Sequence, residues 1–131
     1  MAGTGGTPLA TKLGVRPGWV LALLGAPDDL ELELPPGVTV RNRAAGRADA
    51  VLQFVTRARD LESRIDRLAA MVHPAGGVWI AWPKRSSGVP TDVTDDGVRS
   101  VALPLGLVDN KVCAVDATWT ALRLVWRVER R

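Results

Sequence analysis

A polar loop after an apolar segment carries side chains that could bind a ligand. Lys84 and Ser87 lie in the stretch Trp82-Pro-Lys-Arg-Ser-Ser-Gly88, directly after the apolar residues 78–82. The lysine supplies positive charge, and the serine hydroxyls with nearby backbone N–H groups can bind an anion. A solvated loop that only introduces the next helix would have the same composition, so the sequence leaves both interpretations open.

A second polar segment, residues 116–119, is predicted to form the turn of a hairpin. If the strand 107–115 runs parallel to the others, this turn lies at the same end of the sheet as the Lys84 loop, and Asp116 and Trp119 face Lys84 and Ser87. A tryptophan in a turn should cover a bound ligand or the hydrophobic core, because it is costly to leave in water. Asp116 either orients Lys84 or closes an Asx turn. We therefore expect a ligand site, where there is one, to consist of Lys84, Ser87, Asp116 and Trp119.

The loop after the first apolar segment lacks the residues of an ordinary nucleotide-cofactor site. Such a site needs glycines that let the backbone approach the ligand, and an acidic residue for the ribose. Here Gly25-Ala-Pro-Asp28 offers one glycine, and Pro27 removes a backbone N–H. We predict that adenosylmethionine binds poorly or not at all, and we expect no cofactor.

The single cysteine and the single histidine do not form a catalytic pair in the sequence pattern. Cys113 lies within an apolar segment, whereas His73 follows a predicted helix elsewhere in the chain. A Cys/His nucleophile pair needs the two side chains in contact, and a zinc site needs more ligands of this kind. We predict a buried, unreactive Cys113, a structural His73 and no metal site, and we assign no catalytic residue.

Three apolar runs, residues 20–24, 51–55 and 78–82, predict neighbouring parallel strands that are buried on both faces. Residues 58–72 predict an amphipathic helix, because its apolar side chains recur on one face. Its arginines and acidic residues together indicate a solvated, salt-bridged outer face. The other expected elements are a short helix at 7–14, a helix or edge strand at 28–34, a strand at 38–42, a loop at 83–94, a helix at 95–103 capped by Thr94, and a hairpin of strands 107–115 and 121–128.

Strands that alternate with helices predict a mostly parallel, Rossmann-like α/β sheet, and the closing hairpin adds one antiparallel strand. The class I methyltransferase sheet ends in this way, and Pro74-Ala-Gly-Gly77 before a strand resembles its helix-to-strand turn. The expected fold is therefore methyltransferase-like but truncated. The 131 residues favour a single domain, residues 19–131, after an N-terminal segment with a short helix, residues 1–18.

The whole chain from Gly6 onward also resembles a bacterial family of small uncharacterised proteins, a domain of unknown function. The resemblance implies an intracellular bacterial protein and brings no activity with it. It is carried by Gly6-Thr-Pro-Leu9 with Lys12-Leu-Gly14, by Trp82-Pro-Lys84 with Ser87-Gly88, and by the segment from Leu105 to Asp116 with Trp119.

Charge and hydropathy argue against several function classes. The 17 basic and 14 acidic residues leave a net charge of +3, with no long run of like charge, so nucleic acid is not the expected partner. The arginines at 41, 43 and 47 and those at 127–131 lack an interleaved aromatic stripe for base stacking. No apolar run is long enough to span a membrane and no signal peptide is evident, so we expect a cytoplasmic protein.

Together these features favour a non-catalytic or regulatory module that binds an anionic small molecule or a protein partner. The first alternative is an enzyme, methyltransferase-like with an altered cofactor loop. The second alternative is a weak nucleic-acid-binding protein. Adenosylmethionine binding would separate the module from the enzyme, and salt-dependent binding of DNA or RNA would identify the third class.

Overall fold

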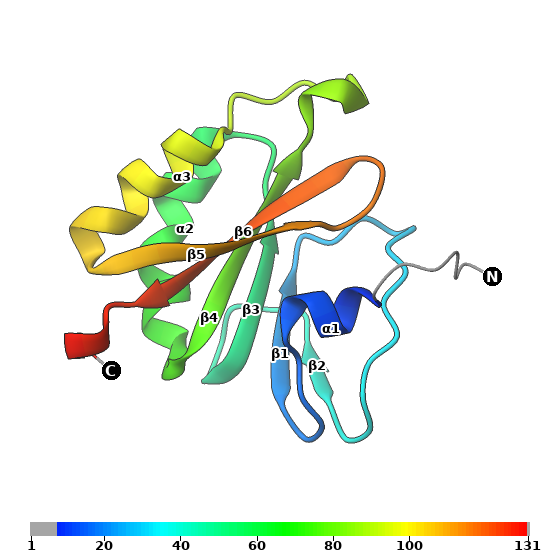
Figure 1. Cartoon of the computed structure of the whole chain (residues 1–131), viewed down its shortest axis with the longest axis vertical. Coiled ribbons are helices and arrows are strands. Elements are labelled where there is room, and N and C mark those ends of the chain that lie inside the picture. The colour runs from blue at the N-terminus through cyan, green and yellow to red at the C-terminus, as the bar shows by residue number, and fades with distance from the viewer. Residues whose placement is uncertain (1–7, 131) are drawn as a thin grey trace.

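The computed structural model describes residues 8–130. Its centre is a six-stranded sheet of order β2-β1-β3-β4-β6-β5 (Figure 1). Neighbouring strands are parallel from β2 to β4, and β6 is antiparallel to both β4 and β5, so the predicted mostly parallel sheet with a closing antiparallel hairpin is confirmed. The strands are β1 (Val20–Leu24), β2 (Thr39–Arg41), β3 (Ala48–Phe54), β4 (Val72–Pro83), β5 (Leu107–Ala114) and β6 (Trp119–Trp126).

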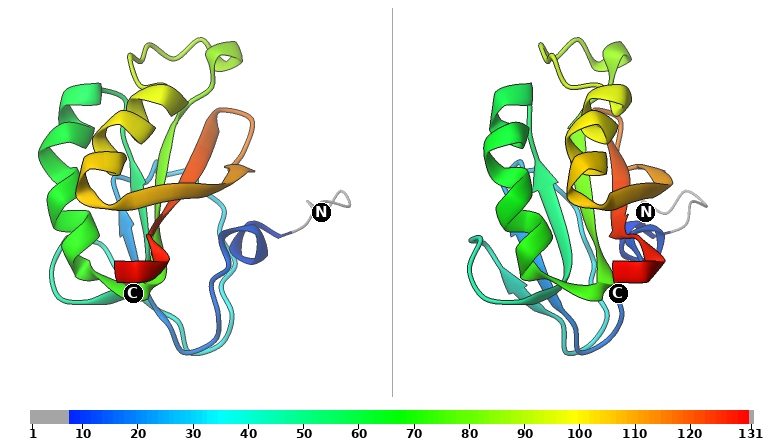
Figure 2. Two further views of the ribbon diagram at one scale, coloured as in Figure 1. Left: turned by 60° about the vertical axis from the view of Figure 1, so that its left-hand side comes forward. Right: turned by 90° about the vertical axis from the view of Figure 1, so that its left-hand side faces the viewer.

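Helices cover the two faces of the sheet unequally (Figure 2). The helices α2 (Ala58–Met71) and α3 (Asp95–Ala102) lie on one face, and the short α1 (Leu9–Leu13) lies on the other. The apolar stripe of α2 is buried against its face of the sheet, as its periodicity predicts. On the opposite face, the ring N–H of Trp79 donates to the carbonyl oxygen of Leu13 at 3.1 Å, which ties α1 to the sheet.

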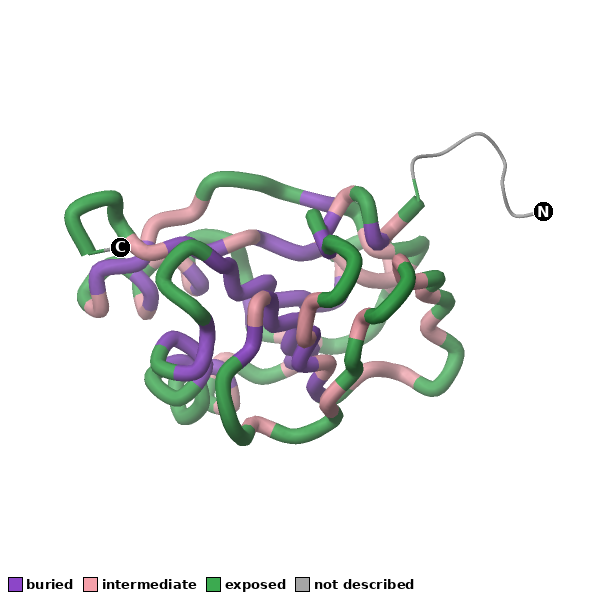
Figure 3. The backbone as a smooth tube through the Cα atoms, turned by 90° about the horizontal axis from the view of Figure 1, so that it is seen from below, coloured by how far each residue is buried: buried purple, intermediate pink, exposed green. Residues whose placement is uncertain are grey.

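The central strands supply most of the core, because they are covered on both faces (Figure 3). Leu52 and Trp79 face α1, whereas Val51, Val78 and Ile80 face α2 and α3, and all five side chains are buried. The three apolar runs are therefore adjacent parallel strands, as predicted. In the described residues no helix has the length and hydropathy needed to cross a bilayer.

The segment 28–34 is neither the predicted helix nor an edge strand, so that prediction is wrong. Leu30, Leu32 and Leu34 are half-buried and pack against the α1 side of the sheet, while Glu31 and Glu33 stay exposed. An extended chain crossing an apolar face buries every second side chain, which accounts for the alternation of leucine and acid.

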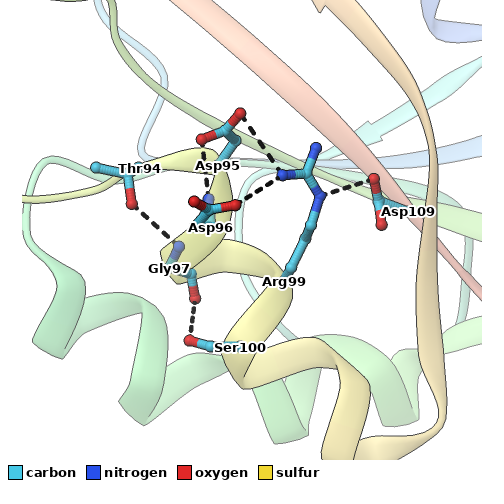
Figure 4. Close-up of polar contacts among 7 residues, drawn as sticks. All are labelled: Thr94, Asp95, Asp96, Gly97, Arg99, Ser100 and Asp109. Carbon is cyan, nitrogen blue, oxygen red and sulfur yellow. Dashed lines mark hydrogen bonds and ion pairs between the residues drawn. The ribbon is translucent and has the colours of Figure 1, made fainter.

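The helix α3 is held at its start and along one side by polar contacts (Figure 4). The hydroxyl of Thr94 accepts a hydrogen bond from the backbone N–H of Gly97 at 3.0 Å, which confirms the predicted cap. Arg99 pairs with Asp96 on its own helix, and its Nε donates to Asp109 of β5 at 3.0 Å. The hydrogen bond to Asp109 raises the pKa of the guanidinium and links the helix to the edge strand.

Candidate functional site

The connections of the sheet diverge between β1 and β3. From β1 the chain moves to β2 on one side, and it then returns to form β3 on the other side of β1. In open α/β sheets, ligands bind in the crevice outside the carboxyl ends of the strands at such a point. A groove of about 440 Å³ lies there, which we call the switch-point groove. It is lined by Leu24, Gly25, Asn42, Arg43, Ala44, Gln53, Ser63, Arg64, Arg67 and Leu68.

A glycine and a buried amide form the inner end of this groove. Gly25 has a φ of +68°, and a Cβ added to it would lie 3.0 Å from the carbonyl oxygen of Phe54. Gln53 is the one polar residue that is buried within residues 8–130, with 3% exposed. Its Nε2 donates to the carbonyl oxygens of Phe54 at 2.9 Å and Leu24 at 3.4 Å, so it joins the ends of β1 and β3. The amide oxygen of Gln53 remains to accept a hydrogen bond from a ligand.

The walls of the groove carry positive charge. Arg43 follows β2, and Arg64 and Arg67 lie on α2, so the charge comes from two different elements. None of the lining residues is a carboxylate. Among the residues that the structure describes, these three side chains form no salt bridge or hydrogen bond. The predicted salt-bridged outer face of α2 is therefore absent, and the groove keeps an unneutralised cluster of arginines.

The four residues predicted to form the ligand site do lie together, at the same carboxyl edge but nearer the hairpin. The Nζ of Lys84 donates to the main-chain oxygen of Asp116 at 2.7 Å. The carboxylate of Asp116 accepts from the backbone N–H groups of Thr118 and Trp119, which closes the turn. Ser87 joins through its hydroxyl, which donates to the carbonyl oxygen of Lys84 at 2.7 Å.

In this hairpin cluster the Lys84 ammonium, the Ser87 hydroxyl and one carboxylate oxygen of Asp116 already have partners in the fold. Trp119 packs edge-on against Phe54, with ring centroids 5.0 Å apart, so its ring covers the core. The ammonium of Lys84 is satisfied by the hairpin turn, although Lys84 also borders a cavity of about 490 Å³. The geometry therefore explains all four side chains structurally, and their role in binding a ligand stays a prediction.

Cys113 and His73 lie in separate places. Cys113 is buried on the α1 face of the sheet, and burial raises the pKa of its thiol against the opposing effect of Lys12 and Lys111. The His73 ring lies 3.9 Å from Asp49, beside the start of β3. Within the described part of the chain, no group of three or more His, Cys, Asp or Glu side chains is arranged to hold a metal ion.

The groove residues were not predicted as a site from the sequence. They come from four separate segments of the chain, and Arg64 and Arg67 look like ordinary surface residues of an amphipathic helix. The one available signal was Gln53, a polar residue inside an otherwise apolar buried strand. A buried polar side chain in such a position requires hydrogen-bond partners, so it indicates a specific structural or functional role for that residue.

Comparison with solved structures identifies the class of the fold. A magnesium protoporphyrin IX methyltransferase from Synechocystis PCC 6803 with bound SAH aligns at a TM-score of 0.58 and 11% identity, covering 85% of this chain and 75% of that chain. The same enzyme has also been solved with bound SAM. A ribosomal protein methylase from Lactobacillus delbrueckii subsp. bulgaricus aligns at 0.58 and 10% identity, over 91% and 75% of the two chains. The fold is therefore methyltransferase-like, in a truncated form.

No family model matches the chain, and no curated protein matches it in sequence. The interpretation as a non-catalytic or regulatory module is nevertheless corrected by the structural comparisons. The similar structures named above are methyltransferases, and one of them has been solved with SAH and with SAM. These findings favour the enzyme alternative over the module. Our expectation relied on the missing glycines of one loop, whereas the groove at the sheet edge is present without them.

Proposed function

We propose that the chain is a methyltransferase-like enzyme with an altered cofactor loop, and that it acts in the switch-point groove. The observation that carries the proposal is the position of this groove between the carboxyl ends of β1 and β3. Ligands of sheets with this kind of topology bind at that point. The similar structures that hold SAH or SAM add support for an enzymatic role of the fold.

The groove residues do not fit adenosylmethionine held in the usual manner. That molecule carries a positively charged sulfonium, and an acidic side chain commonly holds the ribose of a nucleoside cofactor in folds of this type. The groove instead presents three arginines and no carboxylate. Pro27 also lacks an N–H in the loop that would approach the ligand. We therefore assign no step of the reaction to this cofactor.

The groove residues are suited to positioning a substrate and stabilising negative charge. Gln53 offers its amide oxygen in a buried place, and the arginines offer positive charge. Leu24 and Leu68, both buried, add apolar side chains to the lining. The lining contains no histidine, cysteine or carboxylate for proton transfer. Orientation and electrostatic stabilisation are thus the contributions that these side chains make to a reaction.

The experiment blocks the groove and measures turnover. Ser63 is exposed on α2 and lines the groove, so Ser63→Trp fills it without disturbing the core. Glu62→Trp is the matched control, because Glu62 is the exposed neighbour on the same helix and does not line the groove. Each protein is incubated with a bacterial small-molecule extract, with and without methyl-deuterated adenosylmethionine, and conversion is followed by mass spectrometry.

The proposal predicts that the wild type and Glu62→Trp convert at least one compound and that Ser63→Trp does not. Incorporation of deuterated methyl groups would identify methyl transfer, and conversion without incorporation would identify another reaction in the same groove. No conversion by the wild type, or equal conversion by Ser63→Trp, would contradict the proposal. Circular dichroism of all three proteins checks that the substitutions leave the fold intact.

We also propose that the protein belongs to the bacterial family of small uncharacterised proteins that its sequence resembles, and that it works in the cytoplasm. The resemblance from Gly6 onward supports both statements. Its expected partner is a small-molecule substrate, with neither a membrane nor nucleic acid involved. Gel-shift measurements with DNA and RNA at low salt test the last point, because weak electrostatic binding would be visible there.

A further inference from the structure

We propose that the substrate of the switch-point groove carries a phosphate group, which Arg43, Arg64 and Arg67 bind together. This inference rests on the proposed function, since it names the substrate class of the same groove. Its starting point is the charge of the lining, where the structure places three arginines and no acidic side chain.

The arginines come from two different elements that line the groove. Arg64 and Arg67 are three residues apart on α2, a spacing that makes them neighbours on one helix face. Arg43 approaches from the segment after β2. A ligand in the groove therefore meets guanidinium groups from both of these elements. Such an arrangement suits a group with several anionic oxygens better than a single small charge.

These arginines are available to a ligand. Asp60, Glu62 and Asp66 share α2 with them but do not line the groove, and no salt bridge links these acids to the arginines in residues 8–130. Clustered like charges without counter-ions repel one another, and a bound anion relieves this repulsion. The guanidinium also presents N–H groups in a planar fork that matches two phosphate oxygens.

The rest of the lining suits an organic group attached to the phosphate. Leu24 and Leu68 are buried and apolar, and Gln53 offers a carbonyl oxygen beside them. The volume of about 440 Å³ lies within the range of small-molecule sites. A phosphate at the arginines and an uncharged, partly apolar group over the leucines would together fill the groove. A nucleotide has this chemistry, and so does any phosphorylated metabolite of similar size.

The test is isothermal titration of the full chain with pyrophosphate, ADP, adenosine and adenosylhomocysteine. Arg43→Gln and the double variant Arg64→Gln/Arg67→Gln remove charge from the groove. Arg59→Gln is the matched control, because Arg59 is exposed on the same helix but lies outside the lining. Thermal unfolding followed by circular dichroism verifies that each variant is folded.

We expect pyrophosphate and ADP to bind and adenosine not to bind. Because hydrogen bonds to a charged group are lost, the affinity for ADP should fall at least about tenfold in Arg43→Gln and about a hundredfold in the double variant. Arg59→Gln should stay within about twofold of the wild type, since it removes only an exposed, solvent-screened charge outside the lining. Equal affinity for pyrophosphate and ADP would mean that phosphate alone is recognised, whereas tighter ADP binding would show that the organic group also contributes.

Absence of binding by both phosphate compounds would overturn the inference, as would binding that the groove variants leave unchanged. The inference would also be overturned if adenosylhomocysteine bound as tightly as ADP and the arginine substitutions left its affinity unchanged. These results are distinct from failure of the proposed function. Turnover that Ser63→Trp abolishes but the arginine variants preserve would leave an enzyme without a phosphate site. Phosphate binding without any turnover would leave a binding site without an enzyme.

Discussion

Replacing Gly25 by alanine tests how closely the loop after β1 packs on the end of β3. Gly25 and Gly14 both have left-handed backbones, with φ of +68° and +75°, and both are exposed. An alanine with a left-handed backbone lowers the stability of the fold by about 1–2 kcal/mol at either position. At Gly14 the new Cβ meets nothing within 4 Å, so this cost is the whole effect there. Gly14→Ala is therefore the matched control.

At Gly25 the new Cβ adds a steric cost. It would lie 3.0 Å from the carbonyl oxygen of Phe54 and 3.3 Å from Nε2 of Gln53. Either the end of β3 shifts or the hydrogen bonds of Gln53 weaken, which adds about 1–2 kcal/mol, as is typical of overpacked sites. We expect Gly25→Ala to lower the free energy of unfolding by about 2–4 kcal/mol in total, and Gly14→Ala to lower it by about 1–2 kcal/mol.

Urea unfolding followed by circular dichroism measures both losses, and unchanged m-values would confirm that the unfolding transition is comparable. The difference between the variants corresponds to a melting temperature lower by roughly 3–8 °C for Gly25→Ala. Equal losses for the two variants would refute the reasoning, because the loop after β1 would then not be in contact with the end of β3.

Further predictions concern the core, the α3 cap and the buried thiol. Trp79→Phe should destabilise the fold by about 2–4 kcal/mol, since it leaves the carbonyl of Leu13 unpaired and opens a cavity; urea unfolding measures this. Thr94→Ala should cost about 1 kcal/mol in the same assay, whereas Thr94→Ser, which keeps the capping oxygen, should cost less. Cys113 should react slowly with thiol reagents in the native state. Because burial raises its pKa above the ordinary thiol value, stability should be unaffected at neutral pH and fall as the pH rises through the raised pKa. Cys113→Ala should lack this alkaline dependence, and rapid native labelling would count against a core position.

The sheet could be predicted from the sequence because its central strands bury both faces. Residues 20–24, 51–55 and 78–82 are apolar without alternation, which is a local property of each segment. The segment 28–34 could not be assigned in this way. Its alternating leucines suit any extended chain on an apolar face, and which face it crosses depends on tertiary packing.

The two candidate sites differ in how far the sequence could reveal them. Lys84 and Trp119 could be placed together from topology alone, because loops that follow parallel strands emerge at one edge. Their hydrogen bonds to the hairpin, by contrast, became apparent only from the atomic positions. The switch-point groove depends on α2 approaching the segment after β2. The proximity of Arg43 and Arg64 is a tertiary property that no local pattern encodes.

The position of the ligand site is tested most directly by two-dimensional NMR of the ¹⁵N-labelled protein during titration with ADP. If the switch-point groove binds the ligand, the largest shift changes should occur at Gly25, Asn42 and Ser63 and at the side-chain amide of Gln53. The signals of Lys84, Ser87 and Asp116 should move little. Changes centred on Lys84 and the hairpin turn, with the groove signals unmoved, would contradict the account.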